Sequence, residues 1–275
     1  MVIGENNNKT ILADSSFDSN QISNLHLSIE LSSSSLSYCI IDTQKYRCLL
    51  LSSQKLETDN LLEIFSNDDY LSQNFKSKSI SFVNFANTLV PFELYEKEDK
   101  ENLFALNHEL NDEVLLEDNL REEIINLHAV PKLFFQTIKN ILPAATLRSQ
   151  SSILINNFTN LNLKVETMFL YLKDSFVNIV VTKGKNLLFQ NKFNYVTKED
   201  LLFYVLFSIQ ELNFSNEDIN TIVYGNVTED EFSILYDYIR NIKYGNKLKD
   251  ISCSNEFNSI ENHCYSILYR QFLCV

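Results

Sequence analysis

The sequence is poor in the residues that most phosphate-binding motifs require. It has 275 residues, of which only four are glycine and three are proline, and it has no tryptophan. The glycines are too far apart to form a P-loop or a dinucleotide-binding fingerprint; they are Gly4, Gly184, Gly225 and Gly245. A Gly-x-Ser-x-Gly hydrolase elbow is also missing from the sequence. These absences exclude the commonest nucleotide-binding loops and leave the fold to be inferred from hydrophobic periodicity.

Cysteines are few, odd in number and never spaced as a CxxC pair. This pattern supports neither a disulfide framework nor a zinc site, and it suits a reducing compartment. The five are Cys39, Cys48, Cys253, Cys264 and Cys274. His263 next to Cys264 is the one adjacent pair of soft ligands, and one pair cannot complete a tetrahedral site. We therefore predict no metal ligands.

Positive charge is also scarce. The formal net charge is −13 and the pI is about 4.8, so the average field repels nucleic acid and anionic lipid. The acidic residues concentrate between positions 93 and 123. We interpret this acidic segment as a solvated face, with a docking patch for a basic protein as the alternative.

Long hydrophobic runs are missing too. Residues 1–24 are polar and show no secretory signal, and we predict that they form a disordered tail. The most apolar helical stretch, residues 201–209, is too short to cross a bilayer. We expect a cytoplasmic protein without membrane insertion.

Periodicity predicts the same order of elements in each half of the chain. In residues 25–31 apolar and polar side chains alternate, as in a half-buried strand, and two further strands follow at 36–42 and 46–51. Three strand-like runs return in the second half. They cover residues 167–173, 176–183 and 185–193.

Helices and further strands follow each set of three strands. In the first half we predict helices at 56–70 (N-cap Thr58 or Asp59), 96–110 and 132–142, and strands at 79–84, 113–117 and 122–130. In the second half we predict helices at 201–212, 228–242 and 260–272, and strands at 220–224 and 248–253. Residues 144–148 cross between the halves, and a helix at 149–158 links them.

This order predicts an α/β protein with mixed sheets, built from two ribonuclease H-like subdomains that face each other across a cleft. We place the first subdomain at residues 25–145 and the second at 146–275. A single doubly wound sheet is the rival arrangement, and it accounts less well for two separate sets of three strands.

The hairpins and their order resemble the actin-like ATPase superfamily, and more closely a bacterial family of uncharacterised proteins with a degenerate version of that fold. The resemblance implies an Asp-x-Gly turn between the first two strands, where Asp organises magnesium and Gly lets amides approach phosphate. The matching residues here are Glu30, Leu31 and Ser32, followed by Ser33, Ser34 and Ser35. The carboxylate is one methylene longer, and Ser32 adds a Cβ that should crowd phosphate.

The second phosphate-binding turn and the adenosine-binding turn of the superfamily are also degenerate. The second turn matches Tyr171-Leu172-Lys173, followed by Asp174, and the adenosine turn keeps a single glycine in Gly225-Asn226. Lys173 could offset phosphate charge, although a lysine at a strand end is usually solvated. The candidate cleft residues are Glu30, Ser32, Ser33, Ser34, Ser35, Lys173, Asp174, Gly225 and Asn226.

These features predict a non-catalytic binding or scaffold protein with an unknown protein partner, present as a monomer or weak homodimer and without a cofactor. The alternative is a divergent nucleotide-binding protein that holds ATP and magnesium with little or no hydrolysis. A ribonuclease H-type nuclease would need several converging acids, and Glu30 is the only one well placed.

Overall fold

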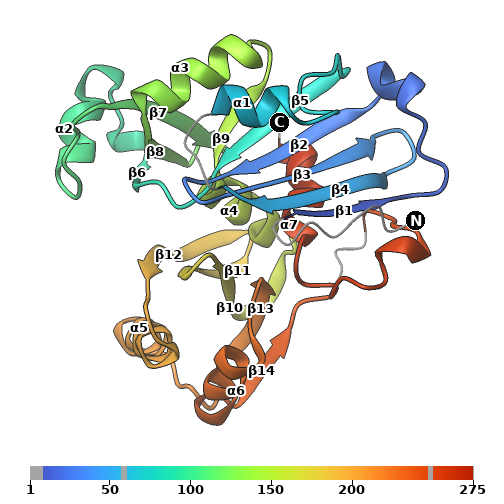
Figure 1. Ribbon diagram of the computed structural model, residues 1–275. Helices are drawn as coiled ribbons and strands as arrows, with labels where there is room; N and C mark the ends of the chain where they lie inside the picture. Colours follow the sequence, from blue (N-terminus) through green and yellow to red (C-terminus); the bar gives the residue numbers. More distant parts are fainter. Residues whose placement is uncertain (1–8, 57–60, 247–249, 275) are drawn as a thin grey trace. The chain divides into compact units, whose positions relative to one another are not determined.

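The computed structural model describes residues 9–56, 61–246 and 250–274, which belong to two compact units (Figure 1). The first unit contains residues 1–153, 250–258 and 271–275, and the second contains residues 154–249 and 259–270. Each unit has its own mixed sheet and hydrophobic core.

The main sheet of the first unit has six strands in the order β1-β4-β3-β2-β5-β9. The strands are β1 (Lys9–Ala13), β2 (His26–Leu31), β3 (Ser35–Asp42), β4 (Arg47–Lys55), β5 (Ser77–Phe82) and β9 (Thr146–Ser149). Strands β2, β3 and β4 form the antiparallel set, whereas β5 joins β2 and β9 joins β5 in parallel. The predicted β-hairpins are confirmed.

Two helices cover one face of this sheet. They are α1 (Leu61–Ser66) and α3 (Lys132–Ile141), which lie next to each other (Figure 1). Alternate β2 side chains, Leu27, Ile29 and Leu31, enter the same core as Phe65 and Ile138 of these helices. The intervening β2 residues therefore belong to the opposite face of the sheet.

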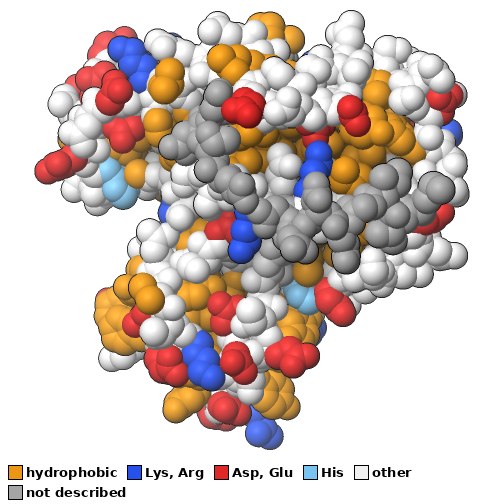
Figure 2. Space-filling view, viewed as in Figure 1, with side chains coloured by type: hydrophobic (Ala, Val, Ile, Leu, Met, Phe, Trp, Pro, Cys, Tyr) orange, Lys and Arg blue, Asp and Glu red, His pale blue; other side chains and the backbone are white. Residues whose placement is uncertain are grey.

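A smaller antiparallel sheet, in the order β6-β8-β7, completes the first unit. Its strands are β6 (Asn87–Pro91), β7 (Glu113–Leu120) and β8 (Ile124–Pro131), and α2 (Lys100–Ala105) packs on it through Phe104. Two 3₁₀ turns, η2 (Phe92–Leu94) and η3 (Lys97–Asp99), lead into α2. Figure 2 shows acidic side chains gathered at the surface over the α2 end of this unit. The acidic segment is mostly exposed, which agrees with a solvated face and equally with a docking patch.

The second unit repeats the same plan with five strands in the order β12-β11-β10-β13-β14. The strands are β10 (Leu163–Lys173), β11 (Phe176–Gly184), β12 (Asn186–Asn194), β13 (Asn220–Gly225) and β14 (Asn241–Tyr244). Strands β10, β11 and β12 are antiparallel, and β13 adds to β10 in parallel, as β5 adds to β2. The predicted duplication is therefore present.

Two helices of the second unit start within three residues of the predicted positions 201 and 228. Helix α5 (Lys198–Glu211) and helix α6 (Glu229–Tyr238) both begin with capping boxes, at Thr197 and Thr228. Helix α4 (Gln150–Asn160), the predicted linking helix, contributes residues to both units. The chain ends with α7 (Ser266–Arg270) and the 3₁₀ turn η5 (Gln271–Cys274).

The prediction of a disordered tail is wrong for residues 9–24. Residues 9–13 form β1, which pairs with β4, and residues 19–24 form the 3₁₀ turn η1 (Ser19–Asn24). Leu12 and Ile22 are buried, and Ile11, Ala13 and Phe17 pack against the same core, so apolar contacts help to attach this polar stretch to the sheet. Residues 1–8 lie outside the described residues.

Several predicted boundaries also differ from the structure. The helix predicted at 96–110 is shorter in the structure and consists of η3 and α2. The helix predicted at 228–242 ends at Tyr238, and β14, which follows it, pairs with β13. The helix predicted at 260–272 is represented by the short helix α7. Residues 146–149 form β9 instead of a crossover, and the strand at 248–253 is represented among the described residues by a bridge from Ser252 to Arg47. The proposed caps Thr58 and Asp59 lie outside the described residues. Short strands were missed because their pairing depends on distant partners.

The Gly225 backbone tolerates no side chain. Its φ is +89°, and an added Cβ would lie 2.0 Å from the Leu172 carbonyl oxygen. Gly184 also has a positive φ, +61°, but a Cβ there would meet only Asn162 Oδ1 at 3.6 Å. We expect Gly184→Ala to lower the free energy of unfolding by about 1–2 kcal/mol, and Gly225→Ala by about 4 kcal/mol or more. Urea unfolding of the two variants measures this difference; equal losses would contradict it.

Burial of His26 makes stability depend on pH. Its ring nitrogens lie 2.7 Å from Ser77 Oγ and 2.9 Å from Ser79 Oγ, and desolvation lowers its pKa from 6.5 to about 4. In the unfolded chain the His26 imidazole therefore becomes protonated below pH 6.5, whereas in the folded chain it stays neutral down to about pH 4. We expect up to about 3 kcal/mol of stability to be lost as the pH falls through this range.

The measurement is the urea midpoint at several pH values in wild type and in His26→Gln. The variant has no imidazole at this position, so its midpoint should fall less steeply between pH 6.5 and about 4. Identical slopes in the two proteins would show that His26 does not carry the effect.

Candidate functional site

The β2–β3 turn, where the superfamily binds phosphate, is closed by its own side chain. The Ser32 hydroxyl oxygen accepts hydrogen bonds from the Ser34 amide at 3.1 Å and the Ser35 amide at 2.8 Å. The Ser32 amide donates to the Ser35 carbonyl at 2.9 Å, and the two hydroxyls lie 2.9 Å apart. Ser32 and Ser35 are buried, whereas Ser33 and Ser34 are exposed. Two backbone amides that a glycine would leave open to an anion are therefore already engaged.

Glu30 lies on the polar face of β2 and is almost completely buried. Gln150, the first residue of α4, is equally buried, and its Nε2 lies 3.5 Å from Glu30 Oε1. At that distance the contact is a long hydrogen bond. Gln150 is not among the predicted site residues, because the pattern of residues 144–148 predicts a crossover in place of the strand β9 that precedes Gln150.

The C-terminal turn η5 covers part of the same face. Gln271 Nε2 donates to the Ile29 carbonyl at 3.1 Å and to Ser79 Oγ at 3.0 Å, and Gln271 Oε1 accepts from Ser81 Oγ at 2.9 Å. Since Ser81 pairs with Glu30 across the parallel strands, Gln271 lies over the neighbouring part of the sheet. Protein side chains thus satisfy polar groups that would otherwise face solvent or a ligand.

The remaining candidate residues lie at the carboxyl ends of β10 and β13 in the second unit. Lys173 ends β10 and is only 4% exposed, so the expectation of a solvated lysine is wrong. Asp174 and Ser175 have φ values of 47° and 63° and connect the paired residues Lys173 and Phe176. Two consecutive positive φ angles are typical of a type I′ hairpin turn, which gives Asp174 a structural role.

Gly225 and Asn226 form a turn that packs directly on β10. The Asn226 amide donates to the Leu172 carbonyl at 2.8 Å, and the Gly225 amide donates to the His263 carbonyl at 3.0 Å. Both amides are therefore bonded within the second unit. The close approach to Leu172 explains the glycine without a ligand.

The candidate residues thus form two groups, one in each unit. Glu30 and the four serines belong to the first, and Lys173, Asp174, Gly225 and Asn226 belong to the second. Within residues 9–56, 61–246 and 250–274, no three His, Cys, Asp or Glu side chains are grouped as metal ligands. The engaged turns do not fit a triphosphate with its magnesium ion.

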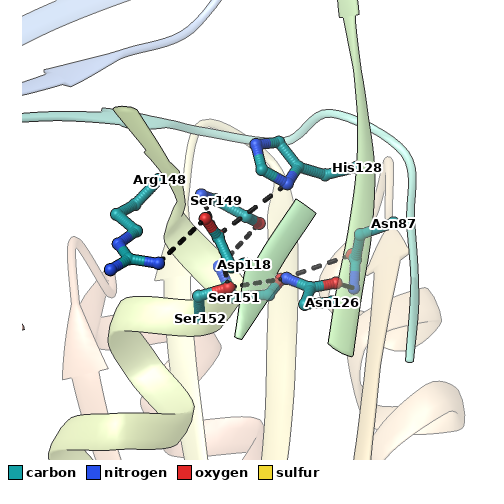
Figure 3. Close-up of polar contacts among 8 residues, drawn as sticks. All are labelled: Asn87, Asp118, Asn126, His128, Arg148, Ser149, Ser151 and Ser152. Atoms are coloured by element: carbon teal, nitrogen blue, oxygen red, sulfur yellow. Dashed lines mark hydrogen bonds and ion pairs between the residues drawn. The ribbon is translucent and has the colours of Figure 1, made fainter. Parts of the chain in front are cut away.

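A second polar cluster, centred on Asp118, was not predicted (Figure 3). Asp118 of β7 is buried, and its carboxylate accepts from Ser152 Oγ at 2.6 Å, the Ser149 amide at 2.7 Å and Arg148 Nη1 at 3.3 Å. Asn126 Nδ2 of β8 donates to Ser152 Oγ at 2.8 Å. The cluster therefore ties the small sheet to the end of β9 and the start of α4.

His128 lies near Asp118 and Ser152, but these three side chains are not arranged as in the catalytic triad of a hydrolase. Its Nδ1 lies 3.8 Å from Asp118 Oδ2, and burial lowers the pKa of its ring despite the nearby carboxylate. Ser152 instead donates directly to Asp118 and accepts from Asn126. In a catalytic triad the histidine lies between serine and aspartate. We interpret the cluster as structural.

Replacing the Asp118 carboxylate should destabilise the first unit. Asp118→Asn keeps the shape but removes the charge that Arg148 faces, and the new amide group places an NH2 donor opposite either the Arg148 guanidinium or the Ser149 amide. We expect a loss of about 3 kcal/mol in the free energy of unfolding, measured with urea. Asp112→Asn, an exposed carboxylate just before β7, is the matched control and should cost less than about 0.5 kcal/mol. Equal effects would contradict a structural role.

The chain belongs to a family described as "Protein of unknown function (DUF3822)", which matches residues 14–242. No curated protein matches the sequence. Among the described residues, no helix has both the length and the apolar character needed to cross a membrane.

Solved structures show the fold. The chain is similar to a Bacteroides thetaiotaomicron protein with an actin-like ATPase fold and unknown function, with 24% identity and a TM-score of 0.77 over 83% of this chain and 93% of that one. It is also similar to a chain of the PilM–PilN type IV pilus biogenesis complex, with 10% identity and a TM-score of 0.61 over 88% of this chain and 96% of that one. The predicted actin-like ATPase fold is therefore confirmed.

Proposed function

We propose that this protein is a non-catalytic binding module, which uses the actin-like fold as a rigid framework for a protein partner. The observation that carries the proposal is the Ser32 hydroxyl, which occupies the Ser34 and Ser35 amides. Phosphate binding at this turn would require those bonds to break and a Cβ to be accommodated next to the anion.

The second unit supports the same conclusion. Asp174 forms a tight hairpin turn, and the amides of Gly225 and Asn226 are bonded to carbonyl oxygens. The Gly225 and Asn226 amides are therefore not free to hold a nucleotide, as backbone amides do in an active ATPase. The alternative, slow nucleotide holding by the same residues, has less support because it would need both turns to rearrange.

An open apolar pocket in the first unit supports a protein partner. Its volume is about 550 Å³, and α1, α3 and Ser33 contribute to its lining. Leu133 is 75% exposed and Leu62 is 57% exposed, although both are large aliphatic residues. Clustered exposed apolar side chains are common where proteins bind one another. The PilM–PilN complex is an example of a chain of this fold in a protein assembly.

The cysteines support the proposed cytoplasmic location. Among the described residues none of the five forms a disulfide, not even Cys39 and Cys48, which lie in neighbouring strands of the main sheet. A protein that keeps its thiols free suits a reducing compartment. We further propose that the protein is a monomer or a weak homodimer when its partner is absent.

Nucleotides should neither stabilise the protein nor be hydrolysed by it. We expect an unchanged thermal midpoint with millimolar ATP or ADP and magnesium, because a ligand at a hundred times its Kd would add about 2.7 kcal/mol of stability. The rate of phosphate release from ATP should equal the rate measured in buffer without protein. Hydrolysis that Glu30→Ala abolished would overturn the proposal, and stabilisation without hydrolysis would favour the alternative.

A further inference from the structure

A second pocket of the first unit, of about 480 Å³, is lined by lysines from three different helical segments. They are Lys97 of η3, Lys100 of α2 and Lys139 of α3, and the floor includes Leu115, Phe135 and Leu147. We call this pocket the lysine groove. We propose that it binds an extended segment of a partner protein that alternates carboxylate and apolar side chains. This inference rests on the proposed binding function and names the chemistry of the partner.

Outer strands on two sides of the groove favour an extended ligand. Strand β7 is an outer strand of the small sheet, and β9 is an outer strand of the main sheet. They meet where the Ser149 amide donates to Asp118, and both line the groove, through Leu115 and Leu147. An outer strand has peptide groups on one side without a neighbouring strand, and an added strand can bond to them.

The β7 backbone is accessible to a donor within the groove. Lys100 Nζ lies 3.3 Å from the Leu115 carbonyl oxygen and donates to it. A side chain thus occupies a bond that a partner amide could make. When a carboxylate binds Lys100, the carbonyl can accept from the incoming backbone instead.

Charge selects an acidic partner. The chain has a net charge of −13, yet three lysines line this groove against one carboxylate, Glu117, which accepts from the Tyr95 hydroxyl. None of the three ammonium groups lies in an ion pair within the part of the chain that the structure describes. Outside the groove, Glu98 and Asp99 of η3 and Glu101 of α2 would repel an acidic partner. The partner carboxylates must therefore reach the lysines themselves.

The apolar floor of the lysine groove can contact the apolar side chains of the proposed ligand. Leu115 is buried, whereas Phe135 and Leu147 are half-buried and remain in contact with the groove. Successive side chains of a strand point to opposite sides. An alternating segment can therefore place apolar side chains on this floor and carboxylates toward the lysines.

The test is fluorescence anisotropy of a labelled synthetic peptide that alternates glutamate and leucine, titrated with the full chain. We expect saturable binding that weakens with added salt. Lys139→Glu should weaken it about tenfold or more, since it replaces an attraction by a repulsion. Lys132→Glu makes the same charge change at an exposed position of the same helix, outside the groove lining, and should leave affinity within about twofold.

Two further peptides separate groove binding from general charge attraction. A lysine–leucine peptide should not bind, and a glutamate–serine peptide should bind more weakly than the glutamate–leucine peptide because it lacks the apolar contacts. Circular dichroism confirms that each variant is folded, and Lys100→Gln provides a milder second variant.

Absence of binding by the glutamate–leucine peptide, or equal weakening by Lys132→Glu and Lys139→Glu, would overturn the groove proposal. Neither result would affect the proposed non-catalytic function, which instead fails if ATP is hydrolysed. The two proposals can therefore fail separately.

Discussion

The Ser32 hydroxyl determines what the first hairpin can do. A side-chain oxygen at this position reaches the amides two and three residues further along and satisfies both, which stabilises the turn without any ligand. A glycine at the same place would leave the amides open and would let an anion approach the backbone. One hydroxymethyl group thus changes a turn that could receive phosphate into one whose polar groups are paired internally.

The same internal pairing extends over the first unit. Gln150 approaches the buried Glu30 carboxylate, Gln271 bonds to β2 and β5, and Asp118 bonds to the start of α4. Buried polar groups destabilise a protein unless they are hydrogen-bonded, so these side chains stabilise one arrangement of strands and helix starts. These bonds hold the unit together without any contribution from a ligand.

The sequence was sufficient to predict elements that depend on local signals. Strand β2 follows the period of two, β10 and β11 contain apolar strand-like runs, and the capping boxes at Thr197 and Thr228 join residues three positions apart. Contacts between distant residues could not be predicted. Asp118 bonds to Ser149 and Ser152, more than thirty positions away, and β1 pairs with β4, about forty positions away.

The burial of individual side chains could not be predicted from the sequence either. Lys173 lies at a strand end, where lysines are usually exposed, but here it is buried. The candidate site residues were chosen by their match to phosphate-binding turns, and the structure shows that residues 32–34 and 174–175 connect paired strands. That match could not show that Ser32 would bond to its own turn, because the geometry of a hydroxyl depends on the backbone around it.

Lysines near open strand edges have a second explanation, since they also discourage strands of other molecules from adding to the sheet. Such lysines are expected on the outer strands themselves, where their charge meets any approaching strand. Those of the lysine groove come instead from η3, α2 and α3, and they surround an apolar floor between β7 and β9. Protection against pairing would not require this floor to stay open, whereas recognition of an acidic, partly apolar segment requires both features in the same place.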